Sequence, residues 1–283
     1  NAAITWQCSR TADFCARLRR EGHEQEIKQV TGLPVATLFA GSKFRWLLEQ
    51  TPQGFEDAAA GRICLGTIDA WLLWNLTGGK AHVSDYSNCA RTMLFDIDKL
   101  CWDKTLCEKL DIPMCMLPEI RSTAEVYGYT SKEMFGAEVP IASLVGDQQA
   151  SLFGQACFHK GDSKNTYGTG CFLLMNIGDK VQTVAWRIKD QVNYALEGSV
   201  FVAGAAIQWL RDGIKLVKTA PESEEHATAV KDSNGVYMVP AFVGLGAPYW
   251  DSDARGAIFG LTRGTTQDHI IRATLESLAY QTY

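Results

Sequence analysis

The amino-acid sequence predicts an α/β fold with two domains. Helical and strand-like segments alternate along its 283 residues, and 46% of them are hydrophobic, which is enough for one large core or two ordinary ones. A glycine-rich turn joins two expected strands between residues 165 and 176, and a compact apolar run at 139–145 leads straight into a helix. We place the domain boundary near residues 156–160, which gives domains 1–157 and 158–283.

The individual elements follow from hydrophobic spacing and from residues that begin or end a helix. Thr67 and Asp69 precede an apolar stretch as a helix start, and Gly78-Gly79 ends it. The run at 139–145 is expected to be a buried strand that turns directly into a helix. Helices are expected at 11–20, 43–49, 68–75, 148–153 and 269–281, and strands at 139–145, in the hairpin 165–176, at 192–197 and at 236–242.

Composition excludes several classes of protein. The net charge is −5 and Lys and Arg are scattered, so nothing favours binding to nucleic acid or to an anionic membrane. No apolar run approaches the roughly 18–20 residues of a membrane helix. The nine cysteines include no CxxC pair and indicate reduced thiols, and the five histidines have no metal-site spacing. We therefore expect a cytoplasmic protein without membrane insertion.

The segment Gly146-Asp147-Gln148-Gln149 follows the apolar run directly. A carboxylate at the C-terminal end of a strand lies at the crevice where open α/β sheets bind ligands, and the next helix offers N–H groups to anions. Asp147 can act there as a general base or metal ligand, and Gln148 can hydrogen-bond a hydroxyl. The alternative is that Asp147 only caps the helix, and the local sequence alone favours it.

Other candidate residues are equally ambiguous on local grounds. The Gly168-Thr169-Gly170 turn could point N–H groups at phosphate oxygens or could simply close a hairpin. Gly204 opens a helix and would allow close approach either of a nucleotide or of a neighbouring strand. Trp6 and Phe172 could form the apolar wall of a polyol pocket or could belong to the core.

Longer strings identify a family. The chain resembles the glycerol kinases of the FGGY carbohydrate kinase family over essentially its whole length. The stretch at 256–261, followed by His269 and residues 273–276, is similar to the family's second signature. The other matching strings are WQCSRT at 6–11, GTID at 66–69, DYSN at 85–88, RTMLF at 91–95, GDQQA at 146–150, NTYGTG at 165–170, NYALEG at 193–198, IQWLRD at 207–212 and PYWD at 248–251.

This resemblance implies an actin-like ATPase fold, with two ribonuclease-H-like domains around a cleft. It also implies transfer of the γ-phosphoryl group of ATP to a terminal hydroxyl of glycerol, with Mg²⁺ as cofactor. By the same resemblance, Thr169 meets the nucleotide phosphates, and Gly204 and Gln208 lie along the nucleotide. A homo-oligomer, dimer or tetramer, is expected.

The resemblance also assigns the substrate side of the site. Asp147 becomes the general base, close to the metal, and Gln148 hydrogen-bonds the polyol. Trp6 and Phe172 enclose the carbon backbone of the polyol. Phosphoryl transfer needs positioning, charge neutralisation and one carboxylate that accepts the hydroxyl proton, so the resemblance reverses the local preference for a simple cap at Asp147.

Five departures from the family pattern are visible. The family's opening strand and phosphate-binding turn, with an Arg-Glu pair that holds glycerol hydroxyls, would precede Asn1, and its adenine-binding glycines would follow Tyr283. Leu38 stands where the family usually has a tyrosine that contacts glycerol. The loop at 130–136 lacks the family's known regulatory residues. The loop at 178–186 is several residues short, from which we expect an interruption of the chain near residues 182–184.

Two alternatives follow from these departures. Leu38 favours a kinase of the same family that acts on another small polyol or ketose. The segments expected beyond both ends favour an inactive, non-catalytic fragment of such a kinase. A sugar-binding regulator of related fold has less support, because no helix-turn-helix or basic patch is visible.

Overall fold

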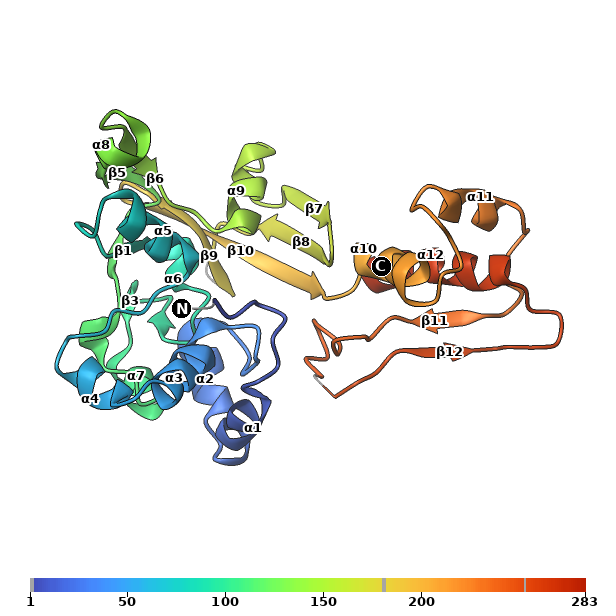
Figure 1. Ribbon diagram of the computed structural model, residues 1–283, viewed down its shortest axis with the longest axis horizontal. Helices are drawn as coiled ribbons and strands as arrows, with labels where there is room; N and C mark the ends of the chain where they lie inside the picture. The colour runs from blue at the N-terminus through green and yellow to red at the C-terminus, as the bar shows by residue number, and fades with distance from the viewer. Residues whose placement is uncertain (1–2, 180–181, 252) are drawn as a thin grey trace. The chain divides into compact units, whose positions relative to one another are not determined.

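The computed structural model describes residues 3–179, 182–251 and 253–283, which form two compact units (Figure 1). Unit 1 comprises Asn1–Lys164 and Leu174–Glu197, and unit 2 comprises Asn165–Leu173 and Gly198–Tyr283. The chain therefore passes from one unit to the other three times. Each passage lies inside a strand: β7 (Ser163–Tyr167), β8 (Cys171–Asn176) and β10 (Gln191–Val200).

The helices of unit 1 are mostly short and amphipathic. In α1, Cys15 and Leu18 are buried, and Arg17, Arg19 and Arg20 occupy the last turn, where positive charge complements the helix dipole. The helices of this unit are α1 (Ala12–Arg20), α2 (Glu24–Thr31), α3 (Ala40–Gln50), α4 (Gly54–Ala59), α5 (Ile68–Leu76), α6 (Tyr86–Cys89), α7 (Lys104–Lys109), the 3-10 turn η1 (Met114–Met116), α8 (Lys132–Phe135) and α9 (Asp147–Gly154).

The strands of unit 1 form small sheets. A parallel pair, β1 with β4, places Asp85 opposite Arg121, and β9 runs antiparallel to β10 in the four-stranded sheet ordered β7-β8-β10-β9. The pairs β2–β3 and β5–β6 are antiparallel. The strand bounds are β1 (Val83–Asp85), β2 (Phe95–Asp96), β3 (Cys101–Trp102), β4 (Glu119–Arg121), β5 (Ala124–Tyr129), β6 (Pro140–Ser143) and β9 (Thr183–Ile188).

Unit 2 packs helices on a two-stranded antiparallel pair, β11 with β12. Its longest helix, α12, buries Ile271 against Leu210 and Val217, and Ala273 against Val236 and Met238. These contacts form the core of the unit. Its elements are α10 (Gly204–Gln208), the π-helical turn η2 (Trp209–Gly213), α11 (Glu222–Thr228), β11 (Tyr237–Val239), β12 (Ala257–Phe259) and α12 (Gln267–Thr282).

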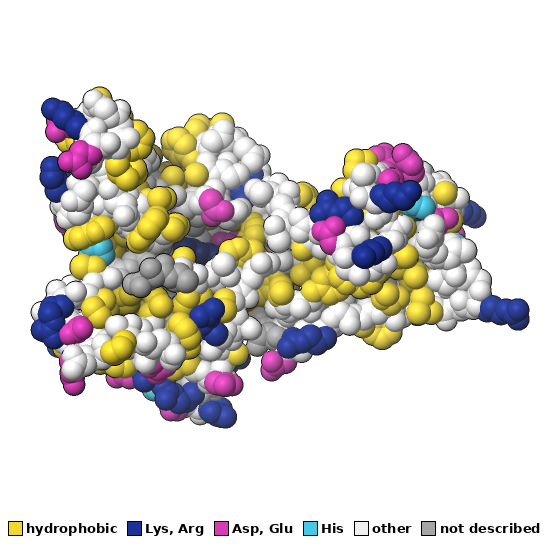
Figure 2. Space-filling view, viewed as in Figure 1, with side chains coloured by type: hydrophobic (Ala, Val, Ile, Leu, Met, Phe, Trp, Pro, Cys, Tyr) yellow, Lys and Arg dark blue, Asp and Glu magenta, His cyan; other side chains and the backbone are white. Residues whose placement is uncertain are grey.

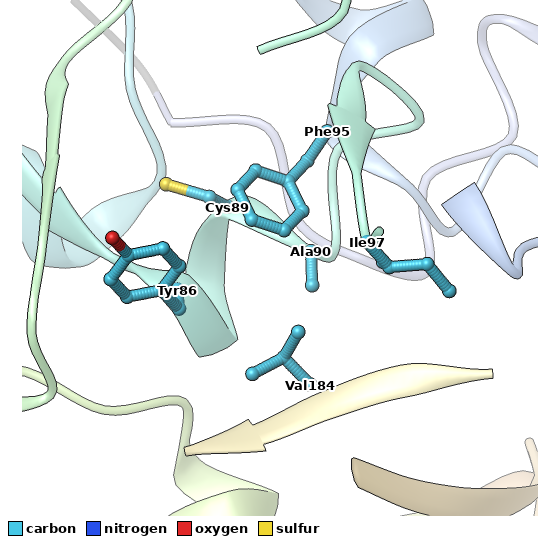
Figure 3. Close-up of a cluster of buried hydrophobic side chains, with 6 residues drawn as sticks. All are labelled: Tyr86, Cys89, Ala90, Phe95, Ile97 and Val184. Carbon is cyan, nitrogen blue, oxygen red and sulfur yellow. The ribbon is translucent and has the colours of Figure 1, made fainter. Parts of the chain in front are cut away.

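Two clusters of buried apolar side chains belong to the core of unit 1. One contains Leu73, Val83 and Tyr127, from α5, β1 and β5. The other joins α6 to β9 and is drawn in Figure 3, where the Phe95 ring lies among its neighbours. Phe95 meets the rings of Tyr86 and Trp102 edge-on, with 6.1 Å between centroids in both pairs, a favourable aromatic geometry. The second cluster comprises Tyr86, Cys89, Ala90, Phe95, Ile97 and Val184.

The surface carries mixed charges and some exposed apolar side chains. Figure 2 shows Lys and Arg interspersed with Asp and Glu, and apolar side chains at the surface in the region of α5. The exposed apolar residues of α5 include Ile68, Trp71 and Leu72.

Within the described residues, no helix has both the length and the apolar character needed to cross a membrane. All nine cysteines carry free thiols.

Most expected elements are confirmed, and two expectations are wrong. The hairpin at 165–176 corresponds to β7 and β8, and the last expected helix to α12. The apolar run at 139–145 contains β6, but β6 is largely exposed, because in the described part of the chain it pairs with β5 alone. The interruption expected near 182–184 is wrong, because Thr183 and Val184 lie in β9 and pair with β10. Residues 180 and 181 of that loop lie outside the described residues.

Phe95 tests the core of unit 1. Phe95→Ala should lower the free energy of unfolding by about 3–5 kcal/mol, because a fully buried ring with two aromatic neighbours is lost. Urea unfolding followed by fluorescence measures this change. The matched control is Phe135→Ala, at a ring that is 57% exposed, for which about 0.5 kcal/mol or less is expected. Equal losses in the two variants would contradict the assignment of Phe95 to the core.

Candidate active site

Asp147 is the first residue of α9, and its side chain is exposed. Gly146, which has extended backbone (φ −62°, ψ 142°), is the N-cap residue of the helix, so Asp147 is not an ordinary capping residue. A Cβ at Gly146 would lie 2.6 Å from Gln149 Oε1, so the turn fits glycine. The Asp147 carboxylate therefore faces solvent at the positive end of the helix dipole, which stabilises its negative charge.

A buried aspartate fixes the turn that precedes Asp147. Asp85, at the end of β1, is fully buried and accepts hydrogen bonds from Ser87 N (3.1 Å), Ser87 Oγ (2.8 Å), Asn88 N (3.0 Å), Asn88 Nδ2 (2.8 Å) and Thr123 Oγ1 (2.7 Å). Ser87 Oγ in turn accepts from Gly146 N at 2.8 Å. Because buried carboxylates need such donors, Asp85 holds the main chain that carries the candidate base.

The role of Asp85 was not foreseen from the sequence, although the string DYSN was noted. An Asp that follows a short apolar strand and precedes Ser and Asn is typical of an N-cap, and that signal was available. The contacts of Asp85 with Thr123 and, through Ser87, with Gly146 span 38 and 59 residues. Those contacts depend on the tertiary structure, so local sequence could not reveal them.

Gln148 lies between the candidate base and a buried lysine. Its Nε2 donates to Asp147 Oδ2 at 3.1 Å, and its Oε1 accepts from Lys164 Nζ. Lys164, in β7, is buried. The lysine thus fixes the amide so that its NH₂ group faces Asp147. Asp147 and Gln148 are consecutive and joined by a side-chain hydrogen bond, and the contact with Lys164 is one that the sequence analysis missed.

Trp6 is partly exposed and lies in irregular backbone ahead of α1. Its carbonyl accepts a hydrogen bond from Lys43 Nζ (3.1 Å), as do the carbonyls of Thr5 (2.9 Å) and Leu38 (3.5 Å). Burial lowers the pKa of Lys43 to about 8. The segments of Trp6 and Leu38, which the family resemblance places near the polyol, are therefore held by one side chain.

In unit 2, the Gly168–Gly170 turn is packed on the start of α10. Gly204 N donates to Gly168 O (2.8 Å), and Ala203 N (2.8 Å) and Ala205 N (3.1 Å) donate to Thr169 O. A Cβ at Gly204 would lie 2.6 Å from Gly168 O. Close main-chain packing thus explains glycine at this position. Three amides at the start of α10 already have carbonyl partners, and the Thr169 side chain remains exposed.

The remaining two predicted residues also belong to unit 2. Phe172, in β8, is half-buried, and Gln208 is the exposed last residue of α10, immediately before the π-helical turn. The candidate residues are thus divided between the units: Trp6, Asp147 and Gln148 in unit 1 and the other four in unit 2. The turn and helix of unit 2 bring Thr169 and Gly204 together through the main chain.

Within residues 3–179, 182–251 and 253–283, no group of three His, Cys, Asp or Glu side chains could hold a metal ion. Asp147 supplies one exposed carboxylate. That donor set fits Mg²⁺, which typically binds through one or two carboxylates together with water and substrate phosphates, rather than in an all-protein cage.

Family models match both parts of the chain. The N-terminal domain of the FGGY family of carbohydrate kinases matches residues 1–154, and its C-terminal domain matches residues 163–283. The chain belongs to the FGGY family of carbohydrate kinases. This agrees with the mixed α/β architecture of the two units and with the actin-like ATPase fold of the family.

Individual relatives refine the comparison. A glycerol kinase of Thermoanaerobacter sp. (strain X514) and glycerol kinase 1 of Clostridium tetani are each 57% identical to this chain, over 99% of its length. A crystal structure of Plasmodium falciparum glycerol kinase with ADP is 36% identical, has a TM-score of 0.85, and matches 99% of this chain and 57% of its own. Xylulose kinase of Lactobacillus acidophilus, at 23% identity and TM-score 0.82, shares the fold. The chain spans about 58% of the length of these curated relatives.

Gly204 provides a test of the turn in unit 2. Gly204→Ala should destabilise the protein by about 1–3 kcal/mol, because the added methyl group would be forced against the Gly168 carbonyl oxygen. Thermal unfolding of the full-length protein measures the loss. Gly154→Ala is the matched control, since an added Cβ at this helical residue meets nothing within 4 Å. If Gly204→Ala were as stable as Gly154→Ala, the close packing of turn and helix would be refuted.

Proposed function

We propose that the protein transfers the γ-phosphoryl group of ATP to a terminal hydroxyl of glycerol, giving glycerol 3-phosphate, with Asp147 as general base. The observation that carries this proposal is the exposed Asp147 carboxylate at the start of α9, next to an amide fixed by Lys164. The identity of 57% to curated glycerol kinases supports glycerol as the substrate, and among solved structures the glycerol kinase is 36% identical and the xylulose kinase 23%.

The geometry suits phosphoryl transfer because this reaction depends mainly on positioning and on charge stabilisation. Asp147 accepts the proton of the attacking hydroxyl. Gln148 offers its NH₂ group beside that carboxylate and orients the polyol, and Trp6 with Phe172 provides apolar contact for the carbon backbone. A hydroxyl bound by both Asp147 and Gln148 would have its reactive oxygen directed by two fixed partners.

The nucleotide side is assigned to unit 2. Thr169 has an exposed side chain on a turn whose main chain is fixed by α10, so its hydroxyl is available to phosphate oxygens. Gly204 and Gln208 lie on the same helix and would flank the nucleotide. Asp147 would hold Mg²⁺ together with the nucleotide phosphates, and the ion would supply charge neutralisation for the transferred group.

A second candidate is a kinase of the same family for another small polyol or a ketose. Leu38 favours it, because leucine cannot donate the hydrogen bond of the tyrosine expected there. ATP consumption by the full-length protein across glycerol, erythritol, dihydroxyacetone and pentuloses distinguishes the two candidates. The highest kcat/KM with glycerol supports the first, and the highest value with another acceptor supports the second.

Further expectations follow from family membership. We propose residues 1–157 and 158–283 as portions of the family's two domains, a homo-oligomeric assembly, and a cytoplasmic location. The matched family ranges leave residues 155–162 between them. The contact-based units divide the chain differently, since strand residues 174–197 belong to unit 1.

Asp147 is tested by removing its charge. Asp147→Asn should lower kcat by about 10²–10⁴-fold, because the hydroxyl proton loses its acceptor. The melting temperature and the affinity for ATP should stay close to those of the wild type, since the side chain is exposed. Steady-state kinetics with glycerol measure the effect. Asp190→Asn, at another exposed aspartate, serves as control. A turnover near that of wild type in Asp147→Asn would exclude this residue as the base.

Leu38 is tested by restoring a hydroxyl donor. Leu38→Tyr should lower KM for glycerol by about 2–10-fold, which corresponds to one neutral hydrogen bond of about 0.5–1.5 kcal/mol. Leu38→Phe supplies the same ring without the hydroxyl and should not reproduce the gain. If the tyrosine and phenylalanine variants have the same KM, the hydroxyl makes no contact with glycerol.

A further inference from the structure

Lys43 is a buried cation with an unusual set of partners. It lies in the first turn of α3 and is only 6% exposed. Its ammonium group donates to the carbonyls of Thr5 (2.9 Å), Trp6 (3.1 Å) and Leu38 (3.5 Å). An ammonium group has three donors, so two short strong bonds and one longer bond account for all of them. Across the described residues, no carboxylate lies within 4.0 Å of Lys43 Nζ, whereas the more exposed Arg91 and Lys99 each pair with a buried carboxylate.

Burial of an unpaired charge is costly, and a carboxylate is its usual partner. A lysine in this place would ordinarily extend its stem and leave its charge in water. Here burial lowers the pKa of Lys43 to about 8, and the hydrogen-bond acceptors of its ammonium group are three main-chain carbonyls. An apolar side chain of similar length would avoid the desolvation cost, so packing alone does not explain lysine here.

The start of α3 is itself fixed. Ala40 N donates to Arg91 O (3.2 Å) and Gly41 N to Thr92 O (2.8 Å). A Cβ at Gly41 would lie 2.3 Å from Thr92 O, so the helix start lies directly against the main chain after α6. Lys43 therefore extends from a helix start that main-chain hydrogen bonds hold in place.

The segment that Lys43 holds has little regular structure of its own. Residues 3–10 form neither helix nor strand, and Cys8 N donates to Thr5 O within the segment. Lys43 bonds to this segment across 37 and 38 residues of sequence, and to Leu38 across five. It thus joins the main chain of Trp6 to that of Leu38 through one nitrogen atom.

We propose that Lys43 is a positioning residue that sets the place of Trp6 relative to Leu38 and thereby shapes the polyol end of the site. Its kinetic consequence rests on the proposed function, whereas its structural consequence does not. Loss of the ammonium group removes a donor from three carbonyls, of which Thr5 O keeps Cys8 N as a donor, and releases the Trp6 segment from α3. The residues assigned to the nucleotide, Thr169, Gly204 and Gln208, are distant from Lys43 in the sequence. Within the described residues, none of them forms a hydrogen bond with Lys43.

Hydrogen exchange and kinetics of the full-length protein test this role. In Lys43→Met, amide exchange should rise about 10-fold or more in peptides that cover residues 3–10 and 36–39, because three hydrogen bonds are lost. KM for glycerol should rise about 10-fold, with KM for ATP within about 2-fold of wild type. Lys43→Arg keeps the positive charge and the hydrogen-bond donors. Its amide exchange and its KM for glycerol should therefore stay close to the wild-type values. Lys28→Met, at an exposed lysine of α2, is the control and should change neither measurement.

Each outcome decides for or against the role. Unchanged exchange in residues 3–10, or a uniform rise of exchange across the chain with equal changes in both KM values, would overturn it. If Lys43→Met does not fold, Lys43→Gln, which retains an NH₂ donor, is measured in its place. Amide exchange in residues 3–10 and KM for glycerol should then rise in the same direction but by a smaller factor. If the wild type does not phosphorylate glycerol, the proposed function fails, and the exchange experiment still decides the role of Lys43.

Discussion

The candidate site of unit 1 depends on the buried carboxylate of Asp85. A charged group that is fully withdrawn from water is stable only when donors surround it. Asp85 has five, from Ser87, Asn88 and Thr123. Because Ser87 also accepts from Gly146 N, the hydrogen bonds that stabilise the buried charge also fix the turn before Asp147. Stability and placement of the candidate base thus have one physical cause.

The same network reaches the sheet. Thr123, which donates to Asp85, donates its N–H to Arg187 O (2.8 Å) and accepts from Arg187 N at Oγ1 (3.1 Å). The Arg187 guanidinium lies 4.7 Å from the centroid of the Tyr86 ring, a cation–π contact. Strands β1 and β9 are therefore connected through polar contacts as well as through the apolar cluster of Figure 3. Asp85, Thr123 and Arg187 thus supply one another's hydrogen-bond partners, and this network fixes the candidate site within unit 1.

Two cations of unit 1, the partly buried Arg91 and the buried Lys43, show how differently the chain satisfies positive charge. Arg91 forms a bidentate pair with the buried Glu197, at 2.8 and 2.9 Å, and lies over the Phe39 ring. Lys43 has main-chain carbonyls instead. A guanidinium matches the fork of a carboxylate, whereas a compact ammonium can be surrounded by separate oxygens. Arginine thus joins two side chains rigidly, and lysine gathers main-chain segments that have no side chain in common.

The sequence was sufficient for the helices α1, α3, α5, α9 and α12, for the hairpin of β7 and β8, and for the family. Such features have periodic or local signals. The exposure of β6 could not be predicted, because an apolar run indicates a preference for burial and not whether neighbouring strands cover it. The partners of Asp85, Lys43 and Lys164 were also missed. Each contact depends on where distant segments meet, and a single Asp or Lys in a sequence gives no sign of that. Gly204 shows the reverse case, since its local pattern allowed two explanations and the 2.6 Å approach to Gly168 O favours packing.

Leu38 has separate roles for its main chain and its side chain. Its carbonyl belongs to Lys43, while its half-buried side chain takes no part in that hydrogen bond. The main chain at this position is therefore held in the same way whichever side chain follows it. A change from tyrosine to leucine removes a hydroxyl donor without removing a support of the fold. Under the proposed function, separation of the main-chain anchor from the side chain would allow the acceptor preference to vary while the main chain of Trp6 keeps its contact with Lys43. The anchor is the buried Lys43, and the variable element is the side chain at position 38, five residues before it.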